Sequence, residues 1–254
     1  MARNLPLSER QTRAATQRKT PTRTSRKAAA TPKRDAARSK RAILDASLIE
    51  FSTYGHAGAR IDMIAERAGV SKPLIYSYFG DKDQLYAAAL REAYVQIRQG
   101  ERDLHLDHKD PETAIRDLVN FTLRHFQQKP WFISMLNTEN LRGGETIRQI
   151  KDVGDIQSHL MDELGSLIDR GVAMGVFRPG IAPTDLYITI ASLCYFPISN
   201  MHTLRAVFNA PIDEDWLAKR SADIGEMVIR FLRPDPATKP LPRDNLHPSR
   251  GANS

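Results

Sequence analysis

Apolar residues recur along this chain with the spacing of amphipathic helices rather than the alternation of strands. Near the start, Ile43 and Phe51 lie on one face of a first helix, which Gly55 is expected to end. A second, shorter apolar face spans 61–68, and Gly69 follows it as the residue type that most easily adopts a left-handed helix cap. The spacing therefore predicts a first helix, then a short second helix closed by a glycine turn.

A third short helix is predicted directly after this turn. Ser71 stands where a helix N-cap is expected, and Pro73 falls in the first turn, where its missing N–H costs little. Gly80 ends this helix. Asp81 followed by Gln84 has the pattern of a capping box, which indicates the start of a fourth helix.

The rest of the chain has the same helical texture. No strand-type alternation of useful length and no internal repeat is present. Glycine and proline separate the segments, notably Gly143-Gly144 and Pro211. The fold class expected is all-α with about nine helices, the later ones over 81–99, 112–128, 131–142, 153–175, 184–207 and 214–232.

The two short helices over 61–79 cannot bury much core between them. A pair of short helices joined by a tight turn serves to hold its second helix at an angle that fits the major groove of DNA. The pattern thus predicts a helix-turn-helix unit over 35–82. Residues 83–232 would form a second helical unit that binds a ligand and dimerises.

Charge is distributed unevenly along the 254 residues. Residues 1–41 hold 13 Lys and Arg against two acids, a net of +11, and since the whole chain carries +7, residues 42–254 carry −4. We expect 1–34 to be a disordered basic arm attracted to DNA phosphates. A transit peptide and a solvated extension without specific function are the alternatives. Residues 233–254, with five prolines, are expected to be a loose tail.

Other classes of function find little support. The single cysteine, Cys194, cannot form an intramolecular disulfide, and we expect no metal and no cofactor. No phosphate-binding loop, dinucleotide fingerprint or nucleophile motif is present, so an all-helical enzyme is the weaker alternative. No apolar run is long enough to span a membrane, and a reducing cytoplasm fits the cysteine content.

Four sequence motifs resemble those of a known protein family. RAILDASLIEF, IAERAGVS, LIYSYF and DKDQLY follow one another over about fifty residues in the order and spacing of the N-terminal domain of TetR-family bacterial transcriptional regulators. The later part of the chain resembles that family only in helix number and texture. A DNA-binding repressor without catalytic activity is what this resemblance implies.

The resemblance also assigns roles to residues of the third helix and its borders. Lys72, Pro73 and Ser77 would face base edges, and Tyr76 and Lys82 would hold phosphates. The helix N-terminus at Ser71 would point at a phosphate, which its free N–H groups and dipole favour.

Some positions leave alternatives open. Where the family usually has Thr opening the second helix, this chain has Ala59, and the neighbouring Arg60 is the substitute phosphate contact that we expect. Arg41 and Lys40 either contact the DNA backbone or minor groove or are simply solvated. Among the aromatic and apolar residues of the third helix, Tyr76 is expected to face outward and three to be core: Leu74, Tyr78 and Phe79.

The partners follow from the same reasoning. A DNA-binding protein of this size recognises a palindromic DNA operator best as a homodimer. We expect the dimer to form through 184–207 and 214–232, because these segments have more apolar residues than are needed to cover one side of a helix. A small-molecule effector would sit among aromatic and polar residues of the middle helices: Phe126, Trp131, Met135, Asn140, Met174 and Tyr195. Ordinary core packing explains those residues equally well. A non-specific architectural DNA-binding protein that uses the basic arm is the second alternative.

Overall fold

The computed structural model describes residues 32–235, and this part of the chain is entirely helical, without a strand. The all-α prediction is confirmed, with ten α-helices and two 3₁₀ turns, Leu106–His108 and Ile147–Gln149. The α-helices are α1 Pro32–Gly58, α2 Ile61–Ala68, α3 Lys72–Phe79, α4 Lys82–Arg102, α5 Pro111–Gln128, α6 Pro130–Leu141, α7 Val153–Ala173, α8 Pro183–Ser199, α9 Met201–Phe208 and α10 Glu214–Leu232.

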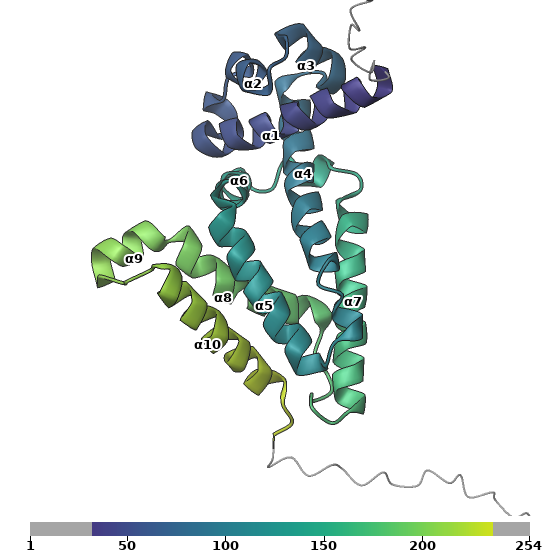
Figure 1. Ribbon diagram of the computed structural model, residues 1–254, viewed down its shortest axis with the longest axis vertical. Helices are drawn as coiled ribbons and strands as arrows, with labels where there is room; N and C mark the ends of the chain where they lie inside the picture. The colour runs from purple at the N-terminus through teal and green to yellow at the C-terminus, as the bar shows by residue number, and fades with distance from the viewer. Residues whose placement is uncertain (1–31, 236–254) are drawn as a thin grey trace, which may run out of the picture.

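The helices form a small N-terminal unit and a larger second unit (Figure 1). Helices α1–α3 lie together at one end of the molecule, and the long α4 starts among them and runs down into the second unit beside α7. Helix α6 lies directly beneath α1 and contacts it. Helices α4 and α6 therefore join the two units by direct contact with the N-terminal unit.

The short helices of the N-terminal unit are held by a compact apolar core. Phe51 of α1, Ile64 of α2 and Ile75 of α3 are fully buried, together with Tyr86 of α4, whose ring packs edge-on against Phe51 at 5.0 Å between ring centroids. Because α2 and α3 each bury only one to three residues, their geometry depends on the longer helices around them. Gly55, with φ of 66°, breaks α1 where the sequence predicts its end.

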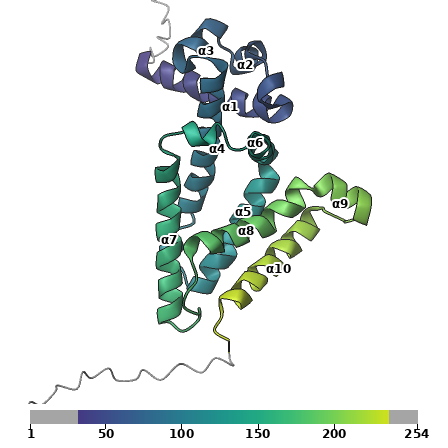
Figure 2. The same cartoon turned by 180° about the vertical axis from the view of Figure 1, so that it is seen from behind.

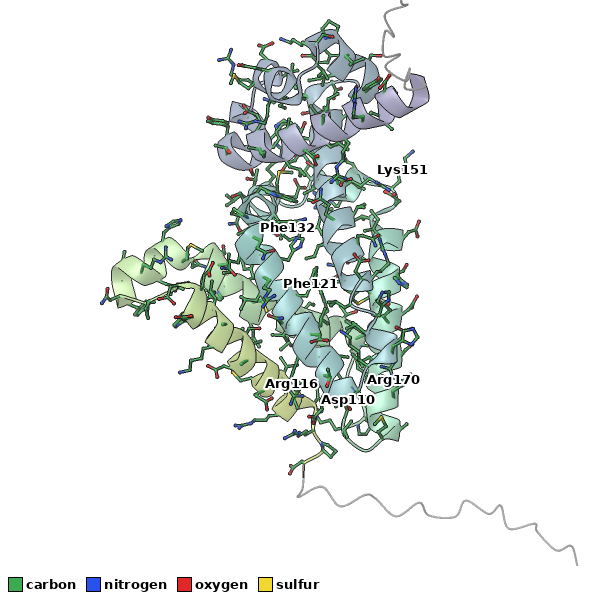
Figure 3. All side chains as sticks on the ribbon, viewed as in Figure 1. Asp110, Arg116, Phe121, Phe132, Lys151 and Arg170 are labelled. Carbon is green, nitrogen blue, oxygen red and sulfur yellow. The ribbon has the colours of Figure 1, made fainter. Side chains whose placement is uncertain are left out.

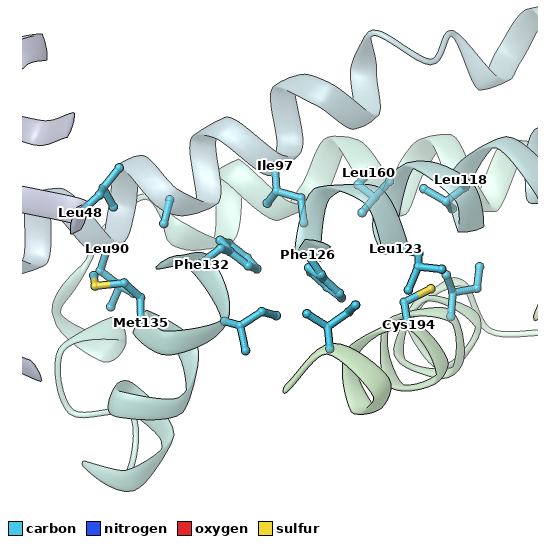
Figure 4. Packing of buried hydrophobic residues seen from close by; sticks show 14 of the residues in the cluster. Leu48, Leu90, Ile97, Leu118, Leu123, Phe126, Phe132, Met135, Leu160 and Cys194 are labelled. Atoms are coloured by element: carbon cyan, nitrogen blue, oxygen red, sulfur yellow. The ribbon is translucent and has the colours of Figure 1, made fainter. Parts of the chain in front are cut away.

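The second unit has a continuous core along its long axis. Figure 4 shows apolar side chains from Leu90 at the N-terminal end through Phe132 and Phe126 to Leu123 and Cys194. All five are buried. Burial raises the pKa of the Cys194 thiol to about 12, so this side chain is a small core group rather than a reactive thiolate.

Hydrogen bonds and ion pairs join the helices at the end of this unit that lies away from α1–α3 (Figure 3). Arg170 of α7 donates to the backbone carbonyl of Leu106, which holds the loop between α4 and α5. Arg116 of α5 pairs with Glu226 of α10 at 2.9 Å and also with Glu112 on its own helix. These contacts join α5 to α10 and the loop before α5 to α7.

One predicted helix is wrong in extent. The segment 184–207 is not a single helix, because α8 ends at Ser199 and α9 begins at Met201. Asn200 makes the break, since both its backbone and its side-chain nitrogen donate to the carbonyl of Phe196. Pro197 inside α8 also lacks the N–H that would continue the hydrogen-bond ladder. The result is that α9 projects away from the body of the molecule in both views (Figures 1 and 2).

The ends of the chain are only partly described. Helix α1 begins at Pro32, three residues before the boundary expected at 35, while the rest of the expected basic arm and nearly all of the expected tail lie outside the described residues. Across 32–235, no helix is both long enough and apolar enough to cross a membrane.

Candidate DNA-binding surface and effector-domain interior

Helix α3 presents a polar face to solvent. Its entry is set by Gly69, whose φ of 66° lets Val70 N–H donate to the carbonyl of Ala65 and closes α2 tightly. Ser71 occupies the N-cap position as expected, but its hydroxyl makes no capping hydrogen bond. The helix start itself offers few free N–H groups, because Pro73 has none and the N–H groups of Leu74 and Ile75 donate to the Ser71 carbonyl at 3.0 and 3.4 Å.

The predicted base-contacting residues share one exposed surface. Every residue expected to contact bases or phosphates from this helix and its cap is exposed: Ser71, Lys72, Pro73, Tyr76 and Ser77. Tyr76 is 43 % exposed although it is aromatic, which agrees with its expected outward orientation. The arrangement brings two hydroxyls, an amine and a phenol onto one side of an eight-residue helix.

The core side of α3 differs from the prediction. Ile75 is its one fully buried residue, while Tyr78 and Phe79 are half-buried against the core. Leu74 is half-buried as well. The spacing of 75, 78 and 79 is i, i+3, i+4, so the inward face is centred one residue later than the sequence analysis placed it.

Lys72 is held by an ion pair on this surface. Its Nζ lies 2.9 Å from Oδ1 of Asp62 on α2. The hydrogen bond and the charge of Asp62 raise the pKa of Lys72, and Lys72 in turn lowers the pKa of Asp62. Both side chains are exposed, so solvent screens the pair. A DNA base or phosphate that binds Lys72 therefore competes with Asp62.

The other expected phosphate ligands border α3. Lys82, half-buried at the start of α4, donates to the carbonyl of Ala57 at 3.1 Å and so ties α4 to the end of α1. Arg60 is exposed and occupies the N-cap of α2, so Ala59 lies one residue before the cap and is buried. The buried carboxylate of Glu50 accepts the Arg60 backbone N–H at 3.1 Å.

Arg41 and Lys40 have structural partners. Arg41 pairs with Glu92 of α4 at 2.6 Å and with Asp45 on its own helix. Lys40 Nζ lies 5.2 Å from the ring centroid of Tyr78, a cation–π contact between α1 and α3. Both side chains hold the N-terminal unit together, and contact with DNA stays a prediction for each.

The structure brings together only part of the expected effector set. The rings of Phe126 and Tyr195 meet edge-on at 6.2 Å, and Trp131 lies beside this group through Phe132. Met135 is buried in the adjacent core. The Tyr195 hydroxyl donates to the side-chain oxygen of Asn137, a polar residue that the sequence analysis did not select.

Asn140 and Met174 do not belong to this group. Asn140 is exposed, and its side-chain nitrogen donates to the Leu136 carbonyl one turn back on α6. Met174 follows the end of α7 and is 60 % exposed. Helix ends near the surface explain both positions, since neither has a neighbouring element to cover it.

Charged residues in the interior were missed by the sequence analysis. Arg98 and Glu101 of α4 are 3 % and 1 % exposed, and His125 of α5 is 6 % exposed. The signal was present, because Tyr94, Arg98 and Glu101 fall at i, i+4, i+7 on the core-facing side of α4. Because Arg98 and Glu101 are charged, the sequence analysis did not assign this face of α4 to the core.

A separate open groove of about 800 Å³ runs along the surface between α5 and α10. Its lining is mostly polar and charged, with Arg116, Arg124, Asn120 and Glu226 among it. It shares no residue with the aromatic group around Phe126. Among residues 32–235, no cluster of His, Cys, Asp and Glu is suited to hold a metal ion.

Comparisons with known proteins agree with this architecture. The family model described as "Bacterial regulatory proteins, tetR family" matches residues 43–89, and "Tetracyclin repressor-like, C-terminal domain" matches residues 111–228. Two similar curated proteins are the HTH-type transcriptional repressor NicS of Pseudomonas putida and the HTH-type transcriptional regulator RutR of Escherichia coli K12. NicS is 36 % identical over 78 % of this chain and 94 % of its own length, and RutR is 30 % identical over 77 % and 91 %.

A solved structure with the same fold is FadR from Bacillus subtilis in complex with stearoyl-CoA. It has a TM-score of 0.59 at 17 % identity, and the match covers 75 % of this chain and 97 % of FadR. The helix-turn-helix unit and the helical domain behind it thus define a DNA-binding regulatory protein. This chain belongs to the TetR family of bacterial transcriptional regulators. As a member of that family it is a ligand-responsive DNA-binding regulator of transcription.

Proposed function

We propose that this chain represses transcription by binding a palindromic operator as a homodimer, and that a small molecule in the second unit releases it. Bases would be read by Lys72, Pro73 and Ser77, and phosphates held by Tyr76 and Lys82. The cytoplasm is the compartment in which this function would be carried out. The observation that carries the proposal is the exposed polar face of α3 at the end of the molecule, with Ile75 of the same helix buried in the core behind it.

The dimer surface follows from apolar side chains that this chain leaves uncovered. Helix α8 exposes Ile188 and Phe196, and α10 exposes Met227 and Phe231. The other faces of these helices are buried in the core, as Ile190 and Ile224 show. A helix with apolar residues on both sides requires a second partner, and a second copy related by a two-fold axis is the commonest one.

For a ligand to release the protein from DNA, its binding in the second unit must change the position of α3. Helix α4 connects the two regions, because it packs on α1 and α3 at one end and on α7 at the other. A ligand that favours a different position of α4 would change the separation of the two recognition helices in the dimer. Only a difference in ligand affinity between the two positions can shift that balance.

Selection of bound fragments from random DNA with the purified full-length chain tests this proposal. We expect an enriched two-fold-symmetric sequence whose half-sites lie about one helical turn, roughly 34–36 Å, apart. Recovery of fragments without a shared motif, together with binding that disappears as salt is raised, would support the architectural alternative instead.

A further inference from the structure

The carboxylate of Asp62 lies on the exposed surface of the helix-turn-helix unit, next to the residue that begins α3. Asp62 is the second residue of α2, and its Oδ1 lies 2.9 Å from Nζ of Lys72. The two side chains are 55 % and 45 % exposed, so each keeps part of its polar surface open to solvent. The N-terminal end of α3 therefore presents an acid together with an amine.

Both members of this ion pair have hydrogen-bonding capacity left over. The ammonium of Lys72 has three N–H donors, and within residues 32–235 Asp62 is its only hydrogen-bond partner. The second carboxylate oxygen of Asp62, Oδ2, accepts no hydrogen bond within the same residues. The pair thus offers two free donors and one free acceptor side by side.

Asp62 is held in its ionised form by the charges around it. The hydrogen bond and the charge of Lys72 lower the pKa of Asp62, and the charge of Arg60 lowers it further. Asp62 also stands in the first turn of α2, where the helix dipole favours a negative charge. An ionised carboxylate can only accept hydrogen bonds. A base edge that faces Asp62 must therefore supply a donor.

The major groove of DNA contains groups that match this pair. Guanine presents two acceptors there, N7 and O6, and cytosine presents the N4 amino group as a donor. Lysine commonly donates to guanine, and aspartate accepts from cytosine. Successive bases are about 3.4 Å apart along a strand, which is close to the separation of the polar atoms of Lys72 and Asp62. The two side chains can therefore face neighbouring base pairs.

We infer that Asp62 is a specificity-determining residue of the DNA contact, and that it selects cytosine in the base pair next to the guanine bound by Lys72. The inference rests on the proposed function, in which Lys72 contacts a base. The two free donors of Lys72 would bind N7 and O6 of that guanine and so occupy its base pair. Oδ2 of Asp62 would accept the N4 amino group of cytosine in the next pair.

The same carboxylate disfavours the other bases. Thymine O4 and guanine N7 and O6 are acceptors, so none of them can donate to Asp62. Adenine offers a donor at N6, but its N7 acceptor lies directly beside that donor and would face the carboxylate as well. Asp62 therefore lowers the affinity for DNA in general and lowers it least where cytosine is present. A difference in affinity between sites is what specificity requires.

A first experiment selects bound fragments from random DNA with the full-length chain and with Asp62→Ala. We expect the parent to enrich cytosine in one base pair of each half-site, directly beside an enriched guanine. Asp62→Ala should lose this cytosine and keep the guanine. The matched control is Glu66→Gln, which removes an exposed acid from the same helix and should keep both bases. An unchanged motif in Asp62→Ala would overturn the inference.

A second experiment measures the discrimination directly, by fluorescence anisotropy at one salt concentration. The selected operator is compared with operators in which that cytosine is replaced by each other base together with its partner. We expect the parent to prefer cytosine by at least about fivefold, and Asp62→Ala to prefer it by less than about twofold. The change should come mainly from tighter binding of the substituted sites. Equal ratios in the two proteins would mean that Asp62 does not contact this base.

Asp62→Asn provides an independent variant with its own outcome. An asparagine side chain pairs with adenine through both N6 and N7, so the selected base should change from cytosine to adenine. Cytosine kept by Asp62→Asn and by Asp62→Ala alike would defeat the inference. Absence of any shared motif for the parent would instead refute the proposed function, so the two failures are distinguishable.

Discussion

The hydroxyl of Tyr86 on α4 lies 3.5 Å from Oε2 of Glu139 on α6, and both side chains are buried. The other carboxylate oxygen, Oε1, accepts the backbone N–H groups of Thr146 and Ile147 at 2.6 and 2.9 Å. Glu139 thus joins the N-terminal part of α4 to the loop that leads into α7. Burial, together with the nearby carboxylate, raises the pKa of Tyr86 to about 12, so its hydroxyl stays protonated and able to donate.

Glu139→Ala should destabilise the folded protein because it leaves two backbone N–H groups without an acceptor. We expect a loss of about 2–4 kcal/mol, since each unsatisfied buried group costs about 1–3 kcal/mol. Tyr86→Phe removes only a long hydrogen bond and should cost less than about 1 kcal/mol. Urea denaturation measures both. Glu145→Ala in the same loop, exposed and paired only with Arg142, is the control and should change stability by less than about 1 kcal/mol. An equal effect of Glu145→Ala and Glu139→Ala would contradict the role of Glu139 as the acceptor for the backbone N–H groups of this loop.

The contacts on α3 and at the start of α4 predict two kinds of DNA-binding variant. Tyr76→Phe and Lys82→Ala should weaken binding to all sequences alike, because phosphates carry no sequence information. Ser77→Ala and Lys72→Ala should alter the preference between operator and mutated sites by about 1–3 kcal/mol for each lost base contact. Fluorescence anisotropy against the selected operator and single-base variants provides the measurement. Equal losses on operator and random DNA for all four would refute the role assignment.

The ion pair between Lys72 and Asp62 predicts that Asp62 weakens the binding of DNA. Asp62→Asn frees Lys72 and removes a negative charge that faces the same side as α3. Binding at low salt should then tighten by roughly threefold to tenfold, with most of the gain in the association rate. Glu66→Gln, an exposed acid on the same helix that has no ion pair with Lys72, separates the two causes. If Glu66→Gln tightens binding as much as Asp62→Asn does, the effect is one of net charge and not of the freed lysine.

The sequence predicted the DNA-binding unit more closely than the interior of the second unit, and the reason is physical. Gly69 and Asp81 act locally, through a left-handed turn and a side chain that accepts the Gln84 N–H, so the residues themselves specify the structure. The break at Asn200 is a competition between a helix and a side-chain cap, which spacing alone does not resolve. Arg98 and Glu101 were missed because burial of a charged pair depends on helices distant in sequence.

The exposed apolar residues of α8 and α10 predict how the dimer is broken. Met227→Asp or Phe231→Asp should shift the protein toward monomer, because each places a charge in the subunit interface, and Met227→Asp should shift it more, because Arg178 lies over the Phe231 ring and can pair with the carboxylate that replaces it. Leu141→Asp is the control, since Leu141 is 90 % exposed at the end of α6 and lies outside α8 and α10. Sedimentation velocity at several protein concentrations measures the result. An unchanged dimer in both α10 variants would place the interface on another surface.

The interior of the second unit predicts two opposite dependences of stability on pH that nearly cancel. Burial raises the pKa of Glu101 from its ordinary 4.5 to about 7, so between these values the folded state holds a proton that the unfolded state has lost. Stability from Glu101 therefore falls as pH rises through that window. Burial lowers the pKa of His125 from 6.5 to about 4, so there the unfolded state holds the extra proton and stability rises with pH.

Replacing either Glu101 or His125 should reveal the dependence of stability on pH that the other residue contributes. In Glu101→Gln, the free energy of unfolding should rise with pH between about 4 and 6.5, by at most about 1.4 kcal/mol per pH unit for one proton. In His125→Phe, whose new ring fits among Phe121, Phe126 and Phe132, it should instead fall as pH rises from about 4.5 to 7. Urea denaturation at half-unit pH intervals measures these slopes, and comparing slopes rather than absolute stabilities removes the fixed cost of each substitution. Parallel pH profiles for both variants and the parent would mean that neither group changes its proton occupancy on folding, because two independent removals that act in opposite directions cannot otherwise leave the profile unchanged.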